Sequence, residues 1–185
     1  MLPRMRSSGA RPSHCVRAGL ALPALLLAAL LAAACGARAA PEASASSPAE
    51  ALPEFRLAAI AGGELGTRDL AGKVVVYDFW ATWCGPCHIQ AEILHALYPK
   101  VVDRGVEFVA VSVGEPEEVV REFLLERPYP YPVLVDPDDE ISARLEILGL
   151  PTLIVVDREG RVVYRNTGIA GADEVERALA AAGAA

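Results

Sequence analysis

Two cysteines, Cys84 and Cys87, stand two residues apart and follow the apolar run Lys73–Trp80, KVVVYDFW. That run suits a central strand buried on both faces, and the residues after the pair have the apolar spacing of an amphipathic helix. A helix that begins here places its unpaired N–H groups and positive end beside Cys84. The pKa of Cys84 should therefore fall below the value of about 8.5 for free cysteine. The i, i+3 spacing puts Cys87 on the same face, one turn deeper, within reach of a disulfide with an exposed Cys84.

One acid, Asp78, lies inside the apolar strand that leads to the pair. Burial disfavours the charged form, so the pKa of Asp78 should be raised and its carboxyl should serve as a base or acid near neutrality. The alternative is an aspartate at a strand end that faces water. Pro86 suits the first turn of the helix, which does not need the N–H that proline lacks.

The cysteine pair has other interpretations. A structural zinc site usually needs four ligands, and the sequence has no second C-x-x-C or H-x-x-x-H pattern. Cys84–His88 also satisfies C-x-x-C-H, the pattern of c-type haem attachment, although the only methionines, Met1 and Met5, stand at the N-terminus. A purely structural disulfide is a further alternative.

Composition limits the class of protein. The 185 residues predict one domain with a tail, and 53% hydrophobic against 22% charged residues excludes a wholly disordered chain. All 24 acidic residues lie after Pro41, whereas four of the 17 Lys and Arg residues lie in the first 17 positions. A body this acidic is a poor nucleic-acid binder, because phosphate contacts need Lys and Arg.

Residues 1–36 have the pattern of a targeting segment. A basic stretch precedes the apolar run 18–34, as in a secretory signal, and an uncleaved membrane anchor is the alternative. Leu31–Gly36 resembles a bacterial lipobox, which makes Cys35 a candidate for lipidation. Ala37-Arg38-Ala39 is instead an ordinary A-x-A-like cleavage site. In each case the rest of the chain is expected outside the cytoplasm, on the periplasmic side, where disulfides persist. It would be either anchored there as a lipoprotein or secreted in soluble form.

The rest of the chain predicts one folded domain. Residues 37–52 lack β-branched and aromatic side chains and should form a flexible tether, followed by a domain over 53–182. The expected strands are Glu54–Ile60, Lys73–Trp80, Val106–Val113, Val133–Val135, Thr152–Asp157 and Arg161–Arg165. One helix is expected after Cys87, with a kink or interruption at Pro99. Further helices are expected over Pro116–Arg127, Asp138–Leu148 and a segment capped by Asp173. This alternation predicts an α/β domain in which a mixed sheet carries helices on both faces.

Two motifs carry a resemblance to a known family. Phe79–Cys87, FWATWCGPC, closely resembles the thioredoxin active-site motif, and Gly149–Thr152, GLPT, resembles the cis-proline motif of that family. The order of elements, the insert around Pro116–Pro132 and the exported tether resemble the TlpA/ResA-type branch, which consists of membrane-tethered thiol–disulfide oxidoreductases. The resemblance implies a thioredoxin fold over 53–182, with an N-terminal strand extension and a central helical insert.

The resemblance also implies residue roles. Cys84 would be the attacking thiolate and Cys87 the resolving thiol, and the two would form a redox-active disulfide. Pro151 would be cis, with the backbone of Leu150 pairing to a substrate strand, and Trp83 would shield the cysteines. The residues expected to contact substrate are Trp83, Pro86, Leu150 and Pro151.

Some positions depart from the family pattern. Asp78 matches the aspartate through which thioredoxin moves protons to and from the deeper cysteine, where many TlpA/ResA-type sequences have asparagine. Gln90 stands where the branch often has glutamate, and Val106–Val113 lacks the lysine that thioredoxin places beside its aspartate. His88 and His95 are expected on the exposed face of the helix.

The predicted function is an extracytoplasmic reductase of protein disulfides that needs no metal or cofactor and draws electrons from a membrane carrier. Cytochrome c maturation and envelope redox balance are the roles that the resemblance suggests. A disulfide oxidant or isomerase of the same fold is the alternative, and a thiol peroxidase or a haem module is a more distant one.

Overall fold

The computed structural model describes residues 50–184. The predicted targeting segment 1–36, the lipidation candidate Cys35 and most of the predicted tether lie outside the described residues. Within 50–184 no helix is both long and apolar enough to cross a membrane.

The described chain alternates strands and helices in the predicted order, with one additional strand. The strands are β1 Arg56–Ala59, β2 Glu64–Gly66, β3 Val74–Trp80, β4 Val106–Val113, β5 Val133–Asp136, β6 Thr152–Val156 and β7 Val162–Thr167. The helices are α1 Gly85–Val101, α2 Glu117–Glu126, α3 Glu140–Arg144 and α4 Ala172–Ala181, with 3₁₀ turns at Thr67–Leu70 and Val102–Arg104.

The strands form one mixed sheet in the order β2-β1-β5-β4-β3-β6-β7. β3 pairs in parallel with β4 and antiparallel with β6, and β4 pairs in parallel with β5. All seven residues of β3 are buried, which confirms its prediction as a central strand. The active-site segment that follows β3 is therefore fixed to the most protected part of the sheet.

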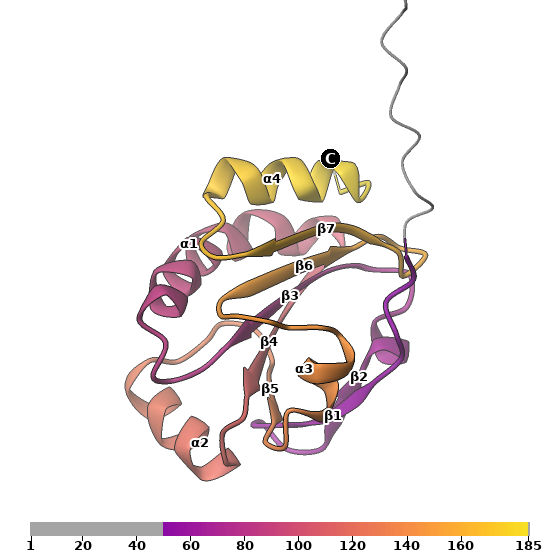
Figure 1. Cartoon of the computed structure of the whole chain (residues 1–185). Coiled ribbons are helices and arrows are strands. Elements are labelled where there is room, and N and C mark those ends of the chain that lie inside the picture. The colour runs from indigo at the N-terminus through magenta and orange to yellow at the C-terminus, as the bar shows by residue number, and fades with distance from the viewer. Residues whose placement is uncertain (1–49, 185) are drawn as a thin grey trace, which may run out of the picture. The chain divides into compact units, whose positions relative to one another are not determined.

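Side chains of β3 alternate between two cores, as the pleat requires. Val74, Val76 and Trp80 belong to the core that contains both cysteines, and Val75 and Tyr77 belong to the core on the opposite face. Figure 1 shows α1 and α4 on one face of the sheet and α3 on the other. The prediction of a mixed sheet with helices on both faces is confirmed.

Three local predictions were wrong, and one strand, β2, was not predicted. α1 continues through Pro99 to Val101 without interruption. α3 has only five residues and is shorter than the predicted Asp138–Leu148, because Asp139 and Glu146 on either side of it adopt positive φ angles. The cap of α4 is Gly171 rather than Asp173, and β2 has too few residues to give a sequence pattern.

The end of the predicted tether contacts the domain. The N–H of Val162 donates to the carbonyl of Glu50 at 2.8 Å, and the N–H of Leu52 donates to the carbonyl of Gly160 at 2.9 Å. Ala51 thereby forms an antiparallel bridge with Arg161 at the start of β7. The chain thus enters the domain at the β6–β7 hairpin, as Figure 1 shows.

Candidate active site

Cys84 and Cys87 form a disulfide at the N-terminal end of α1. Their sulfurs are 2.00 Å apart and their Cα atoms 5.3 Å apart, so the predicted pairing is present. Cys84 is the N-cap residue, and its Sγ accepts a hydrogen bond from the N–H of Cys87 at 3.3 Å. Pro86 lies in the first turn, as predicted. The sulfur of Cys84 therefore occupies the position where a helix stabilises negative charge most strongly.

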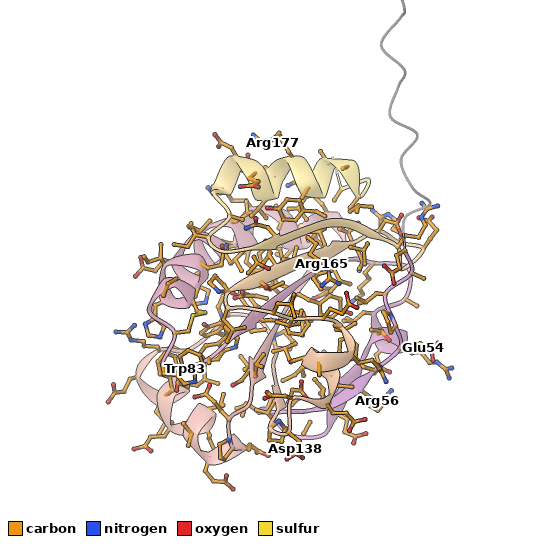
Figure 2. All side chains as sticks on the ribbon, viewed as in Figure 1. Glu54, Arg56, Trp83, Asp138, Arg165 and Arg177 are labelled. Carbon is orange, nitrogen blue, oxygen red and sulfur yellow. A yellow bond between two sulfur atoms is a disulfide. The ribbon has the colours of Figure 1, made fainter. Side chains whose placement is uncertain are left out.

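The exposure of Cys84 differs from the sequence prediction. Cys84 is only 4% exposed, whereas the preceding Trp83 is 72% exposed. The cap geometry explains the difference, because it turns the sulfur of Cys84 inward over the first helical turn, where it bonds to the fully buried Cys87. Trp83 projects outward beside α2, as Figure 2 shows.

A buried carboxylate holds the loop that leads into Cys84. Glu115, in the segment between β4 and α2, accepts hydrogen bonds from the N–H of Thr82 at 2.8 Å and from its hydroxyl. Ser112 donates to the same carboxylate at 3.0 Å. On the other side, Nε2 of His88 lies 3.0 Å from the carbonyl of Thr82. All polar groups of Thr82 are thereby fixed, and the loop before Cys84 is fixed with them.

His88 and His95 are less exposed than the sequence suggested. His88 is half-buried and stacks on Phe123 of α2, with ring centroids 5.4 Å apart. His95 is also half-buried and contacts Tyr129, with centroids 4.7 Å apart. The insert packs against this side of α1 and covers both rings, which helical periodicity alone does not reveal.

The Leu150–Pro151 peptide bond is cis, as predicted. Phe79 of β3 pairs with Thr152 of β6, so Pro151 lies at the end of the sheet from which the Cys84 loop leaves. The carbonyl of Pro151 accepts a hydrogen bond from the N–H of Gly168 at 2.8 Å. The structure thus brings the two sequence motifs to one end of the sheet.

Asp78 is 1% exposed, and neither of its carboxylate oxygens has a hydrogen-bond partner. It alternates with Val76 and Trp80 on β3 and so faces the core that contains both cysteines. Burial raises the pKa of Asp78 to about 7. The prediction that Asp78 is buried is confirmed, and the water-facing alternative is wrong.

Several large apolar side chains are exposed in the segments that carry the cysteine and cis-proline motifs and in the loop bonded to Pro151. They come from three segments of the chain and are Trp83, Ile89, Leu148 and Ile169. Leu148 is 93% exposed and stands just before the cis-proline loop. Ile169 lies next to Gly168, whose N–H holds Pro151. Such a surface suits contact with an apolar segment of another polypeptide.

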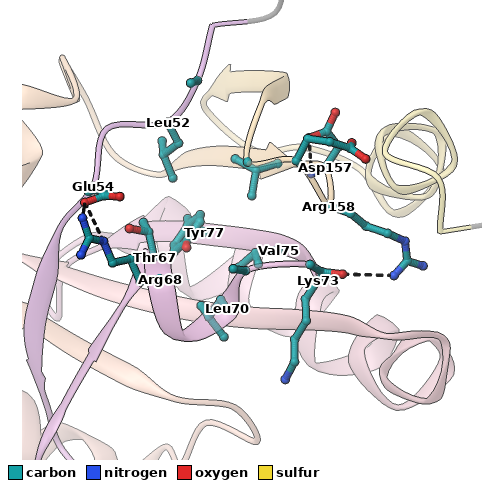
Figure 3. A pocket seen from close by; sticks show the side chains of 16 residues that line it. Leu52, Glu54, Thr67, Arg68, Leu70, Lys73, Val75, Tyr77, Asp157 and Arg158 are labelled. Carbon is teal, nitrogen blue, oxygen red and sulfur yellow. Dashed lines mark hydrogen bonds and ion pairs between the residues drawn. The ribbon is translucent and has the colours of Figure 1, made fainter.

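A cavity of about 230 Å³ lies on the face of the sheet opposite the cysteines. Figure 3 shows Tyr77 and Val75 of β3 in its lining, together with the Glu54–Arg68 ion pair. These β3 side chains belong to the core without the cysteines, so this cavity is separated from the disulfide by the sheet.

Dithiol chemistry fits the site better than thioether attachment of haem. Both sulfurs are already joined to each other, and Nε2 of His88, the histidine of the C-x-x-C-H pattern, is engaged with a backbone carbonyl. Within residues 50–184, no group of three or more His, Cys, Asp and Glu side chains is placed to hold a metal ion.

Comparison with known proteins agrees with this geometry. The Redoxin family matches residues 47–181. The chain belongs to the Redoxin family. This Redoxin is 33% identical over 138 residues to the thiol-disulfide oxidoreductase ResA of Geobacillus kaustophilus, and the match covers 75% of the chain and 79% of the relative.

Two solved structures resemble this Redoxin. A Chlorobium tepidum structure named for the thiol:disulfide interchange protein DsbE has 30% identity and a TM-score of 0.68, and the match covers 74% of this chain and 97% of that chain. A second Chlorobium tepidum protein, named a thiol:disulfide interchange protein of the thioredoxin family, has 25% identity and a TM-score of 0.65, with 75% and 99% covered. The fold is thioredoxin-like, and the protein is a thiol–disulfide oxidoreductase of the ResA/DsbE type.

Proposed function

We propose that this Redoxin is an extracytoplasmic, membrane-tethered reductase of protein disulfides. The observation that carries the proposal is the Cys84–Cys87 disulfide at the N-terminal end of α1, with Cys84 as the cap residue. In the reduced enzyme, the unpaired N–H groups and positive end of that helix favour a thiolate at Cys84.

The reaction transfers two electrons in two exchanges. The Cys84 thiolate attacks a substrate disulfide, which forms a mixed disulfide and releases one substrate thiolate. Cys87 then loses its proton and attacks the sulfur of Cys84, which releases the second substrate thiolate. The substrate disulfide is reduced, and the Cys84–Cys87 dithiol is oxidised to the bond seen in the structure.

Asp78 is the proton acceptor for Cys87 in this proposal. Both residues are buried on the same side of the sheet, and the pKa of Asp78 is raised to about 7 by burial. A carboxyl with that pKa accepts and returns a proton near neutral pH without a large cost in either direction.

Substrate docks on the exposed apolar surface around the disulfide. The backbone of Leu150 beside the cis Pro151 pairs with an extended substrate strand, and Trp83 and Leu148 contact its side chains. Pro86, exposed in the first turn of α1, lies at the same surface.

The direction and place of the reaction rest on the sequence. The Gly85-Pro86 dipeptide resembles that of reducing thioredoxins, and residues 1–36 resemble a secretory or lipoprotein signal with Cys35 as the lipidation candidate. A reductant in an oxidising compartment needs electrons from a membrane carrier. Apocytochromes c and other envelope proteins with disulfides are the proposed substrates.

Insulin reduction tests the proposal. Cys84→Ser should abolish reduction of insulin disulfides, and Cys87→Ser should accumulate a mixed disulfide that captures the substrate in the native host. An unchanged rate for Cys84→Ser overturns the mechanism. A redox potential at or above that of glutathione would instead indicate the oxidant or isomerase alternative.

A further inference from the structure

Buried polar atoms without partners gather on one side of the active-site helix. Residues 50–184 contain seven buried side-chain polar atoms that lack a hydrogen-bond partner. Six of the seven belong to five residues, which are Asp78, Trp80, His95, Tyr129 and Tyr131. Proteins pair nearly all such atoms with other protein groups or with bound water, so this concentration requires an explanation.

Ring contacts join four of these residues. Trp80 stacks on Tyr129 with centroids 4.9 Å apart, and Tyr129 meets Tyr131 at 5.5 Å. His95 of α1 contacts both tyrosines edge-on, at 4.7 and 5.5 Å. We call these four residues and Asp78 the buried polar cluster.

Asp78 lies at the inner end of the buried polar cluster. It precedes Trp80 by one pleat on the same face of β3, and Ala110, opposite it on β4, has only a methyl group. Burial raises the pKa values of Tyr129 and Tyr131, and the negative charge of Asp78 raises both further. The carboxyl is therefore electrostatically coupled to both hydroxyl groups.

A cavity lies at the outer end of the buried polar cluster. It has a volume of about 260 Å³ and is lined by residues of α1, of α2 and of the loop that follows α2. His95 and Tyr129 form part of its wall, and the exposed residues Glu92 and Arg127 form another part, so it communicates with solvent. The buried polar cluster thus extends from a carboxyl in the centre of the sheet to the surface.

We propose that the buried polar cluster is the route by which protons pass between Asp78 and solvent, with water as the ligand that bridges its hydroxyl, indole and imidazole groups. The inference rests on the proposed function, in which Asp78 receives a proton from Cys87. A carboxyl that is 1% exposed cannot release that proton directly to bulk water. Water can bridge these groups because they supply both donors and acceptors within one buried region.

Each transfer conserves protons. The protonated Asp78 donates its proton to the oxygen of a bridging water, and that water passes one of its own protons onward. Nε2 of His95 accepts a proton, and the imidazolium releases one from its other nitrogen to water in the cavity. The net change is one proton moved from Asp78 to solvent.

His95 suits this role because its surroundings favour the neutral ring, which can accept a proton at Nε2. Burial lowers the pKa of His95, and the charge of Glu92 on the same helix opposes that shift. The ionisable groups around the ring are Tyr129 and Tyr131 from the loop after α2, with His88, Glu92 and Arg127 at the cavity.

Tyr131→Phe is the first test, because it removes one hydroxyl and retains the ring. Single-turnover oxidation of the reduced enzyme by a protein disulfide should show release of the second substrate thiolate slowed about tenfold, which is less than the roughly 10²–10⁴ of a full general-base contribution because Asp78 itself is retained. The alkylation rate of Cys84 should be unchanged. Tyr98→Phe is the matched control, because Tyr98 packs on Tyr131 at 5.3 Å but is not part of the buried polar cluster.

Chemical rescue is the second test. His95→Ala enlarges the cavity, so added imidazole should restore most of the lost rate at pH 7, whereas it should leave Tyr131→Phe unaffected. A merely structural role for His95 predicts no rescue. If Asp78→Asn is slow but Tyr131→Phe and His95→Ala both match the wild-type rate, the route is overturned and the proposed function stays intact. A fast Asp78→Asn would instead contradict the role of Asp78.

Discussion

The buried side chain of Gln90 joins the redox helix to a loop 80 residues further along the chain. Its Oε1 accepts a hydrogen bond from the N–H of Ala170 at 2.7 Å. Gly168, two residues earlier, donates to the carbonyl of Pro151 at 2.8 Å. The loop before α4 therefore links the helix that carries the cysteines to the cis-proline segment, and Gln90 fixes their relative position.

Replacing Gln90 with leucine should destabilise the protein. The N–H of Ala170, which is fully buried, would lose its partner, at a cost of about 1–3 kcal/mol. Urea denaturation measures the loss. Glu92→Leu, on the exposed face of the same helix, is the control and should change stability by less than about 0.5 kcal/mol. Equal effects of the two substitutions would show that the hydrogen bond to Ala170 has no special importance.

Glu115→Gln should loosen the loop before Cys84. Both oxygens of the Glu115 carboxylate accept hydrogen bonds from Thr82 and Ser112, whereas the amide of glutamine has only one oxygen. We therefore expect the unfolding free energy to fall by about 1.5–3 kcal/mol, the value of hydrogen bonds to a charged group. The measurement is unfolding free energy together with the insulin-reduction rate. Glu117→Gln removes a surface ion pair with Arg121 and should cost less than about 1 kcal/mol. A Glu115→Gln protein as stable as this control contradicts the assigned role.

Asp78 should make stability fall as pH rises. Its folded pKa of about 7 lies above its unfolded value of about 3.8, so the folded protein holds the proton more tightly. The contribution of Asp78 to stability is then fully present below about pH 4, decreases between about pH 4 and pH 7 and is constant above that. Asp78→Asn should remove this slope and raise stability at pH 8 by up to about 4 kcal/mol.

Urea denaturation across pH 4–8 measures this effect, and Asp138→Asn, an exposed residue labelled in Figure 2, is the control. An Asp78→Asn protein with the pH slope of the wild type would show that Asp78 is ionised normally in the folded state.

The fold could be predicted from the sequence because its signals are local. The apolar run of β3 and the C-x-x-C pair that follows it stand next to each other in the chain, and the buried position of Asp78 follows from that run. The positions of Glu115 and Gln90 could not be predicted, because each acts through a partner 33 or 80 residues away. The same is true of His95, which lies on the helix side that the insert covers.

Leu148→Ser should weaken the binding of protein substrates. The side chain is 93% exposed, so the substitution should change stability by less than about 0.5 kcal/mol. Partial burial of a leucine against a substrate is worth about 1 kcal/mol, so the KM for insulin should rise about fivefold. The rate with a small aromatic disulfide should be unchanged. Leu125→Ser is the control, because Leu125 lies on α2 and is 82% exposed, and an equal rise in KM for both variants would contradict docking at Leu148.

The alkylation rate of each cysteine in the reduced protein, measured by mass spectrometry across pH 4–10, tests the central claim most directly. We predict that Cys84 reacts first, with a titration midpoint below about 8.5, and that Cys87, fully buried one turn deeper, reacts much more slowly. A Cys84 that titrates like a free thiol, or a Cys87 that reacts first, would contradict the assignment of Cys84 as the attacking thiolate.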